Sequence, residues 1–180
     1  MNGSKMLLGK TIIVTGTSRG MGKTMVELFA QNGANVIAHA RSHTDAHEQM
    51  CSELSEKYKT NVVPIYFDLK DQDKIKESVM IIKKQYPVID GLVNNAGITY
   101  NALFQMTSME KLREQFEVNF FSPYLLTQYI SKLMVKQGKG SIVNISSTAA
   151  QDGNSGKSAY GSSVTPSLSL YISSKDMPSK

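Results

Sequence analysis

Short apolar runs rich in β-branched residues alternate along this chain with longer amphipathic stretches. We expect five buried strands, at TIIVTG (11–16), NVIAHA (35–40), VVPIYF (62–67), GLVNNA (91–96) and SIVNIS (141–146). Helical stretches are expected between them at 21–33, 44–58 and 71–86, with a long fourth one from about 108 to 136. This alternation is typical of repeated βα units around a buried parallel sheet. The sequence therefore predicts an α/β fold with a doubly wound parallel sheet.

The usual strand order of such a sheet is 3-2-1-4-5-6, and ligands bind beyond the carboxyl ends near the switch between strands 1 and 4. After SIVNIS one more candidate helix follows, and the chain then ends without a sixth strand. A chain of 180 residues with 41% hydrophobic side chains suits a single core. We therefore predict one domain over residues 1–180.

Charge and cysteine content exclude several classes of protein. The net charge of +5 comes mainly from scattered lysines, and arginine occurs only at Arg19, Arg41 and Arg113. Such scatter argues against dedicated nucleic-acid binding. Cys51 is the only cysteine, which rules out an intrachain disulfide and fits a reducing cytoplasm. No apolar run reaches the roughly 18 residues of a membrane span, so we expect a cytoplasmic protein that does not enter a membrane.

The stretch TGTSRGMG (15–22) joins the first predicted strand to the first predicted helix through three glycines. Glycine lets the backbone turn tightly and approach a pyrophosphate, and the start of a helix favours an anion. The spacing is G-x-x-x-G-x-G rather than G-x-G-x-x-G, and a glycine trio alone would also suit a plain strand-to-helix turn. Because this one lies where the fold places a nucleotide, it predicts a dinucleotide-binding, Rossmann-type domain.

The end of the second predicted strand, NVIAHARSH (35–43), indicates which dinucleotide is preferred. A carboxylate here would accept from a ribose 2′-hydroxyl, whereas arginine suits a 2′-phosphate. The stretch has no carboxylate, Arg41 follows the strand at once, and Arg19 is available from the glycine-rich loop. We expect NADP(H) to be favoured over NAD(H). The alternative is that both are ordinary surface arginines.

Three histidines recur every fourth residue, at His39, His43 and His47. On one continuous helix this spacing would stack three imidazoles and suggest a metal site. His39 belongs to the predicted strand, however, so at most two of the three share a helical face. We expect no metal site.

Five motifs in order resemble those of the short-chain dehydrogenase/reductase family, from about Gly9 to Ser163. They are TGTSRGMG, FDLKD, NNAG, FEVNFFSP and the stretch from IVNISS to AYGSS. The resemblance implies hydride transfer between a nicotinamide and a carbonyl or alcohol carbon. The arginine pattern is similar to that of members that use NADP(H), such as 3-oxoacyl-carrier-protein reductases.

The resemblance also implies the site residues. Tyr160 would give a proton to the carbonyl oxygen, Ser147 would hydrogen-bond the same oxygen, and Asn119 would hold a water in the proton relay. Ser146 is the less favoured serine by spacing. The implied cofactor contacts are Gly16, Ser18, Arg19, Gly20, Met21, Gly22, Arg41, Asp68, Leu69, Asn95, Ala96, Gly97 and Tyr160.

The pattern breaks at Val164. A free tyrosine has a pKa near 10, and the family lowers it with a lysine four residues later, worth up to about three pKa units at 4 Å. Valine supplies no charge. Lys175 would lie about 22 Å along a continuous helix, and Lys157 falls in the predicted loop DGNSGKS. We therefore expect weak or absent activity.

Two further departures follow Ser163. Pro166 in mid-helix would cost about 3 kcal/mol or more. A helix restarting at Thr165 would avoid this cost, but Tyr160 would then lose its helical frame. SLSLYIS (167–173) fits a strand or a helix, and we favour a helix. Family members continue through two more strands and a substrate-covering segment, so the domain is expected to be C-terminally incomplete.

Three interpretations remain open at this point. The first is an NADP(H)-dependent oxidoreductase with weak or absent turnover. The second is a non-catalytic nucleotide-binding or partner-binding protein. The third is a fragment of a longer reductase, truncated or altered in reading frame. The resemblance implies a small-molecule carbonyl or alcohol substrate and allows a homo-oligomer, but the sequence specifies neither the substrate nor the oligomeric state.

Overall fold

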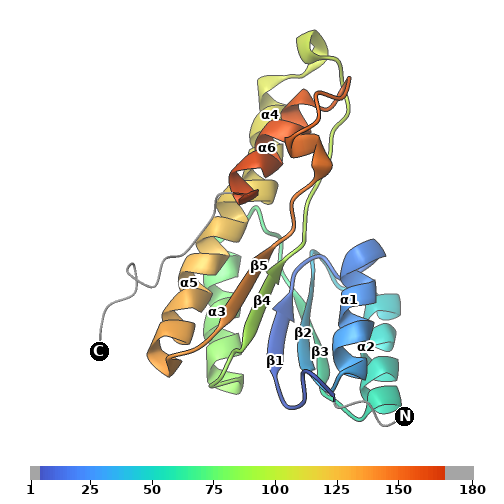
Figure 1. Cartoon of the computed structure of the whole chain (residues 1–180), viewed down its shortest axis with the longest axis vertical. Helices are drawn as coiled ribbons and strands as arrows, with labels where there is room; N and C mark the ends of the chain where they lie inside the picture. Colours follow the sequence, from blue (N-terminus) through green and yellow to red (C-terminus); the bar gives the residue numbers. More distant parts are fainter. Residues whose placement is uncertain (1–4, 169–180) are drawn as a thin grey trace.

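A computed structural model describes residues 5–168 and places five parallel strands in one sheet (Figure 1). The strands are β1 (Thr11–Val14), β2 (Asn35–Ala40), β3 (Val62–Tyr66), β4 (Gly91–Asn94) and β5 (Ser141–Asn144). Their order is β3-β2-β1-β4-β5, and every neighbouring pair is parallel. This order confirms the predicted doubly wound α/β class.

The helices lie close to their predicted positions. They are α1 (Gly20–Gln31), α2 (Asp45–Tyr58), α3 (Gln72–Gln85), α4 (Met109–Phe116), α5 (Ser122–Gln137) and α6 (Ser158–Val164). Shorter turns are the 3₁₀ helices η1 (Phe104–Met106), η3 (Thr148–Ala150) and η4 (Thr165–Leu168), and the π-helix η2 (Glu117–Phe121). The predicted long helix is therefore two α-helices joined by a π turn, a widened turn that occurs often at functional sites.

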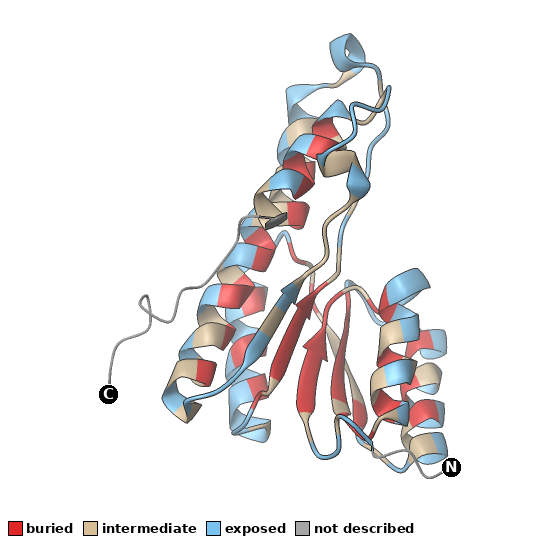
Figure 2. Cartoon of the chain, in the orientation of Figure 1, coloured by how far each residue is buried: buried red, intermediate tan, exposed pale blue. Residues whose placement is uncertain are grey.

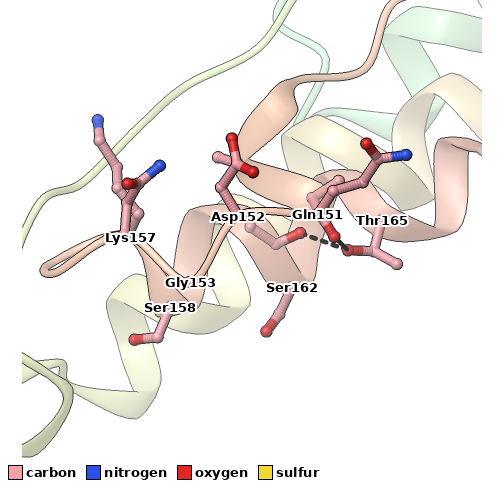
Figure 3. A pocket seen from close by; sticks show the side chains of 11 residues that line it. Gln151, Asp152, Gly153, Lys157, Ser158, Ser162 and Thr165 are labelled. Atoms are coloured by element: carbon pink, nitrogen blue, oxygen red, sulfur yellow. Dashed lines mark hydrogen bonds between the residues drawn. The ribbon is translucent and has the colours of Figure 1, made fainter.

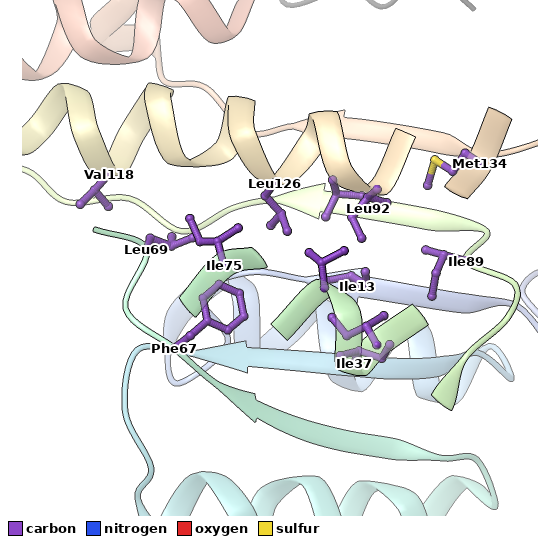
Figure 4. Close-up of a cluster of buried hydrophobic side chains, with 13 residues drawn as sticks. Ile13, Ile37, Phe67, Leu69, Ile75, Ile89, Leu92, Val118, Leu126 and Met134 are labelled. Atoms are coloured by element: carbon purple, nitrogen blue, oxygen red, sulfur yellow. The ribbon is translucent and has the colours of Figure 1, made fainter. Parts of the chain in front are cut away.

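Alternate residues of the central strands point to opposite faces of the sheet, as the pleat requires. On one face, Ile13, Ile37 and Leu92 pack in a cluster with apolar side chains of α3 and α5 (Figure 4). On the other face, Val14 and Val36 pack in a cluster with residues of α1 and α2. The sheet is thus covered on both sides, with α1 and α2 on one and α3 and α5 on the other (Figure 1).

Burial falls off toward the β5 edge of the sheet. β1 and β4 are buried at every residue, whereas β5 alternates exposed and half-buried residues (Figure 2). Ile142 packs against the cluster under α3 and α5, but Val143 on the opposite face stays 46% exposed. In residues 5–168 nothing pairs with the outer edge of β5, which is consistent with the expected incompleteness of the sheet.

The end of α6 shows how the chain accommodates Pro166. α6 ends at Val164, and the chain tightens into the 3₁₀ helix η4, which contains the proline. Tyr160 therefore keeps its helical frame. The expected helix over 167–173 lies largely outside the described residues. None of the helices between residues 5 and 168 is long and apolar enough to cross a membrane.

Candidate nucleotide-binding site and catalytic end

A cleft of about 740 Å³ opens beyond the carboxyl ends of β1, β2, β3 and β4. Its walls come from four loops that lie far apart in the sequence: the loop into α1, the loop after β2, the loop after β3 and the loop after β4. Twelve predicted cofactor residues line it: Gly16, Ser18, Arg19, Gly20, Met21, Gly22, Arg41, Asp68, Leu69, Asn95, Ala96 and Gly97. The thirteenth, Tyr160, does not line this cleft. The parallel strands bring these motifs together because their carboxyl ends meet at one edge of the sheet.

Two glycines let the loop close against its neighbours. Gly16 has φ +72°, and a Cβ there would lie 2.7 Å from the Cα of Ala96. A Cβ on Gly22 would overlap the carbonyl oxygen of Gly16 and lie 2.7 Å from Nδ2 of Asn95. Neither contact leaves room for a side chain, so the backbone of this loop is packed directly against the loop after β4.

The start of α1 differs from the starts of the next three helices. Thr44, Asp71 and Ser108 cap α2, α3 and α4 through their side chains, and each of these helices has an acidic residue in its first turn. α1 has Arg19 at its N-cap position with no side-chain cap and no acidic residue in its first turn. A helix start with unpartnered amides and a positive dipole favours an anion. The cleft therefore fits the pyrophosphate of a dinucleotide.

The loop after β4 holds the glycine-rich loop by hydrogen bonds. The hydroxyl of Thr15 accepts from the backbone amides of Asn95 and Ala96, at 3.0 Å each. The Asn95 side chain donates to the carbonyl oxygens of Thr15 and Gly16, at 2.9 and 3.1 Å. Both amide hydrogens of Asn95 are thus committed to the loop, so its side chain orders the cleft wall.

The charged side chains around the end of β2 are the ones that the sequence predicted there. Arg19 and Arg41 are exposed in the cleft lining, and no carboxylate lies at the end of the strand. Asp68, after β3, accepts from the backbone amide of Lys70 at 2.9 Å. Both guanidinium groups remain available to an anion at this end of the cleft.

The three histidines form no metal site: within residues 5–168, no group of three His, Cys, Asp or Glu side chains could hold a metal ion. His43 is exposed and pairs with Glu48 at 2.6 Å, whereas His39 and His47 are buried beside the glycine-rich loop. Burial lowers the pKa of His39 to about 4. The sequence did not predict that His39 would line the cleft. Its position in NVIAHA, at the carboxyl end of a central strand, was the only available signal.

Two neighbouring serines follow β5 and are used differently. Ser146 donates to the carbonyl oxygen of Val164 at 2.9 Å, which ties the strand end to α6. The hydroxyl oxygen of Ser147 accepts from the backbone amide of Ala149 at 3.2 Å and so caps η3. Accepting leaves the hydroxyl hydrogen of Ser147 available to donate. Of the two, Ser147 is the one whose hydroxyl hydrogen has no acceptor among residues 5–168.

Asn119 lies in the π turn and connects three segments. Its Oδ1 accepts from the backbone amide of Ile98 at 2.8 Å, and its Nδ2 donates to the carbonyl oxygen of Ile98 and to the hydroxyl of Ser163. Both amide hydrogens are therefore used within the protein. In this arrangement Asn119 joins the loop after β4 to α6, and it has no hydrogen left to donate to a relay water.

Tyr160 is half-buried on α6, and its hydroxyl makes no hydrogen bond to the described residues. Val164, one turn later, is only 6% exposed and apolar. Lys157 lies nearer than the loop prediction implied, because its Nζ is 5.6 Å from the centroid of the Tyr160 ring and donates to Oδ1 of Asn101 at 2.8 Å. The ammonium group thus faces the tyrosine ring, in a cation–π arrangement.

A second pocket, of about 350 Å³, lies against α6 and shares no lining residue with the nucleotide cleft (Figure 3). Ser158 and Ser162 of α6 and Thr165, the first residue of η4, line it on one side, and the loop from Gln151 to Gly153 lines it as well. Neither Tyr160 nor Val164 lines this pocket. It therefore does not connect the tyrosine to the nucleotide cleft.

A doubly wound parallel sheet with a glycine-lined, uncapped helix start at its switch point defines a Rossmann-type dinucleotide-binding fold. The family described as short chain dehydrogenase matches residues 10–165. The chain belongs to this family of oxidoreductases.

Three relatives illustrate the similarity. A 3-oxoacyl-acyl-carrier-protein reductase of Thermotoga maritima is 39% identical over 159 residues, covering 87% of this chain and 63% of that protein. A short-chain dehydrogenase of Streptomyces avermitilis is 32% identical, with a TM-score of 0.81 over 94% of this chain and 59% of that one. A candidate NAD(P)-dependent gluconate 5-dehydrogenase of Beutenbergia cavernae, with NADP bound at low occupancy, is 28% identical, with a TM-score of 0.85 over 93% of this chain and 66% of that one. The chain thus spans 59 to 66% of the length of these relatives.

Proposed function

We propose that this chain binds NADP(H) in preference to NAD(H), in a single dinucleotide-binding unit whose hydride-transfer activity is weak or absent. The observation that carries the proposal is the convergence of twelve cofactor-motif residues on one cleft, at an uncapped helix start. The relative with bound NADP supports the choice of ligand class. The name of the related 3-oxoacyl-acyl-carrier-protein reductase supports a carbonyl or alcohol substrate. A cytoplasmic setting is part of the same proposal.

The residues of the cleft divide the binding task. The amides at the start of α1 would hold the pyrophosphate, and Arg19 and Arg41 would bind the 2′-phosphate through charge-assisted hydrogen bonds. A bound nicotinamide would supply or accept the hydride. Ser147, whose hydroxyl hydrogen is uncommitted, would donate to the carbonyl oxygen of the substrate, and Tyr160 would transfer the proton.

Turnover is expected to be low because Tyr160 has no cation at position 164. A cation one helical turn after a tyrosine would stabilise the negative charge left on the phenol oxygen when its proton is transferred, and valine supplies no charge. Lys157 faces the ring and is already hydrogen-bonded to Asn101, so it is a weaker source of charge than a lysine one helical turn after the tyrosine. Asn119 has both amide hydrogens committed, so a relay water would have to be held by an oxygen of this residue.

Equilibrium titration with NADP⁺ and NAD⁺ tests the binding proposal. We expect NADP⁺ to bind at least tenfold more tightly, and Arg41→Ala to remove most of that difference by weakening NADP⁺ alone. Arg113→Ala is the matched control, because Arg113 is an exposed arginine of α4 that does not line the cleft. Equal affinities for the two nucleotides, or an equal loss from both arginine variants, would refute the preference.

A second candidate function is nucleotide or partner binding without chemistry, favoured by the buried Val164 behind Tyr160. Reduction of a 3-oxoacyl thioester and of simple ketones with NADPH separates the two, since the acyl substrate follows from the named relatives. Turnover above the buffer blank supports the weak oxidoreductase. Nucleotide binding with no turnover on any of these substrates supports the binding protein.

A further inference from the structure

We propose that His39 is a positioning residue of the nucleotide cleft: its neutral imidazole, fixed as the Nε2–H tautomer, holds the Gly16 amide and with it the glycine-rich loop. The inference rests on the proposed function, because it concerns the loop that would contact the dinucleotide. Nothing in the sequence motifs assigns this role to a histidine at the end of β2.

Hydrogen counting fixes the state of the His39 ring. The backbone amide of Gly16 donates to Nδ1 at 3.3 Å, so Nδ1 carries no hydrogen. Nε2 lies 2.9 Å from the carbonyl oxygen of Phe67, which can only accept, so Nε2 carries the hydrogen. The ring therefore spans the loop before α1 and the segment after β3. A proton on Nδ1 would set two donors against each other and break the bond to Gly16.

A second histidine supports the same loop from α2. The Thr17 hydroxyl donates its one hydrogen to the carbonyl oxygen of His39 at 3.0 Å. It must therefore accept from Nε2 of His47, 2.7 Å away. Nδ1 of His47 then faces the hydroxyl of Tyr66 at 3.3 Å. If His47 were protonated, its Nδ1 could donate to that hydroxyl, so this outer bond tolerates either state while the His39 bond does not.

The surroundings keep His39 neutral. It is 2% exposed and packs against the Phe67 ring, 4.1 Å between centroids. Two titratable groups nearby have opposite effects on the pKa of His39: His47 on α2 lowers it, and Asp68 after β3 raises it. Desolvation outweighs both the Asp68 charge and the Phe67 bond, which accounts for the lowered pKa of about 4. Burial, and to a smaller extent the neighbouring His43, lowers the pKa of His47. Burial raises the pKa of Tyr66, with Cys51 and Glu48 adding to that effect.

The hydrogen bond from the Gly16 amide to His39 lies in a tightly packed part of the loop, where another contact could not easily replace it. Gly16 has positive φ and lies against Ala96, and its amide is oriented by His39 alone among the side chains described. Losing this acceptor would leave the partly buried amide of Gly16 without its side-chain partner, which costs more than losing a fully exposed hydrogen bond. The loop would then relax away from the conformation that the start of α1 presents to a phosphate.

The first test needs no ligand. Histidine ¹⁵N–¹H correlation spectra of the full chain, recorded from pH 8 to pH 5, report the tautomer and titration of each ring. We expect His39 to show the Nε2–H pattern throughout this pH range. A His39 ring that titrates near pH 6.5, or that carries its hydrogen on Nδ1, would overturn the proposal even if no dinucleotide bound.

The second test compares two variants that each keep one of the two bonds. In His39→Asn the side-chain oxygen can replace Nδ1 as acceptor for Gly16, and in His39→Gln the amide nitrogen can replace Nε2 as donor to Phe67. We expect NADP⁺ affinity at pH 7.5 to change less than threefold in His39→Asn and to fall at least tenfold in His39→Gln. His43→Asn is the matched control and should bind like the parent.

The two variants separate positioning from packing. A role in packing alone would lower the affinity of both by the same factor, and that result would refute the proposal. Should His39→Gln not fold, a threefold or smaller effect in His39→Asn still supports it, and a tenfold loss there refutes it. If the parent chain binds no dinucleotide, the proposed function fails, and the ligand-free spectra alone decide the role of His39.

Discussion

The nucleotide half of the chain runs from β1 to β4, and the catalytic end runs from β5 to α6. The two regions differ in how far their strands are buried and in how their loops are held by hydrogen bonds. β1 and β4 are buried throughout, and Thr15 and Asn95 join the loops that follow them by hydrogen bonds. His39, at the end of β2, holds the loop after β1 through Gly16. β5 is half-exposed and α6 has only seven residues. The residues of the cleft therefore hold one another in place without contacts from the catalytic end. We expect that a variant can lose nucleotide binding or turnover without losing the other.

The largest effect should come from Gly22→Ala, which attacks the nucleotide half directly. The new Cβ would overlap the carbonyl oxygen of Gly16 and press on Asn95. We expect NADP⁺ affinity to fall at least 100-fold and the free energy of unfolding to drop by about 2 kcal/mol through overpacking. Isothermal titration and urea denaturation measure the two quantities. Gly153→Ala, where a Cβ meets nothing within 4 Å, is the control and should change neither.

The next effect is the pH dependence of stability. The folded-state pKa of His39 is about 4, below the ordinary value of about 6.5, so the unfolded chain binds the proton more readily between these values. The contribution is fully present above pH 6.5 and is lost as the pH falls toward 4, by about 3 kcal/mol at most. Denaturation of the parent and of His39→Asn at several pH values isolates it as their difference. A pH-independent difference would contradict the burial of a neutral ring.

Val164→Lys probes the catalytic end. If the missing cation is the main defect, kcat for ketone reduction should rise about tenfold or more, since one pKa unit is worth about 1.4 kcal/mol. NADP⁺ affinity should stay within about threefold. Val164→Met controls for a longer side chain without charge. An unchanged kcat would mean that the short catalytic end, rather than this one residue, limits turnover.

The smallest effect is expected from Ser146→Ala, which removes the bond between β5 and the carbonyl oxygen of Val164. One such bond contributes about 1 kcal/mol to stability. Thermal unfolding should show this loss with no change in NADP⁺ affinity. Ser162→Ala, an exposed serine of α6, should leave both unchanged. Weaker NADP⁺ binding by Ser146→Ala would show that the two halves are coupled after all.

The strand order and the convergence of motifs on one cleft could be predicted, because parallel strands with known crossovers must bring their carboxyl ends to one edge. The start of the second helix could also be predicted, since it was expected at residue 44 and α2 begins at Asp45 with Thr44 as its cap, a side-chain acceptor that acts locally. The His39 bond to Gly16 was not predictable, because it depends on which amide faces the ring across 23 residues. The π turn that orients Asn119, and the position of Lys157 over Tyr160, likewise arise from packing between distant segments.

The position of β1 between β2 and β4 has a consequence for the order in which the chain folds. Gly16 and His39 are 23 residues apart, whereas Thr11 and Asp90, beside the β1–β4 pair, are separated by 79 residues. Closing the longer loop costs more chain entropy, and pairings of high sequence separation form slowly. We expect the unit from β1 to β3 to form first and β4 to join it late. The loop after β4, which contains Asn95, would then complete the cleft last. The rate at which the refolding chain gains nucleotide affinity would therefore report the rate at which β4 joins the sheet.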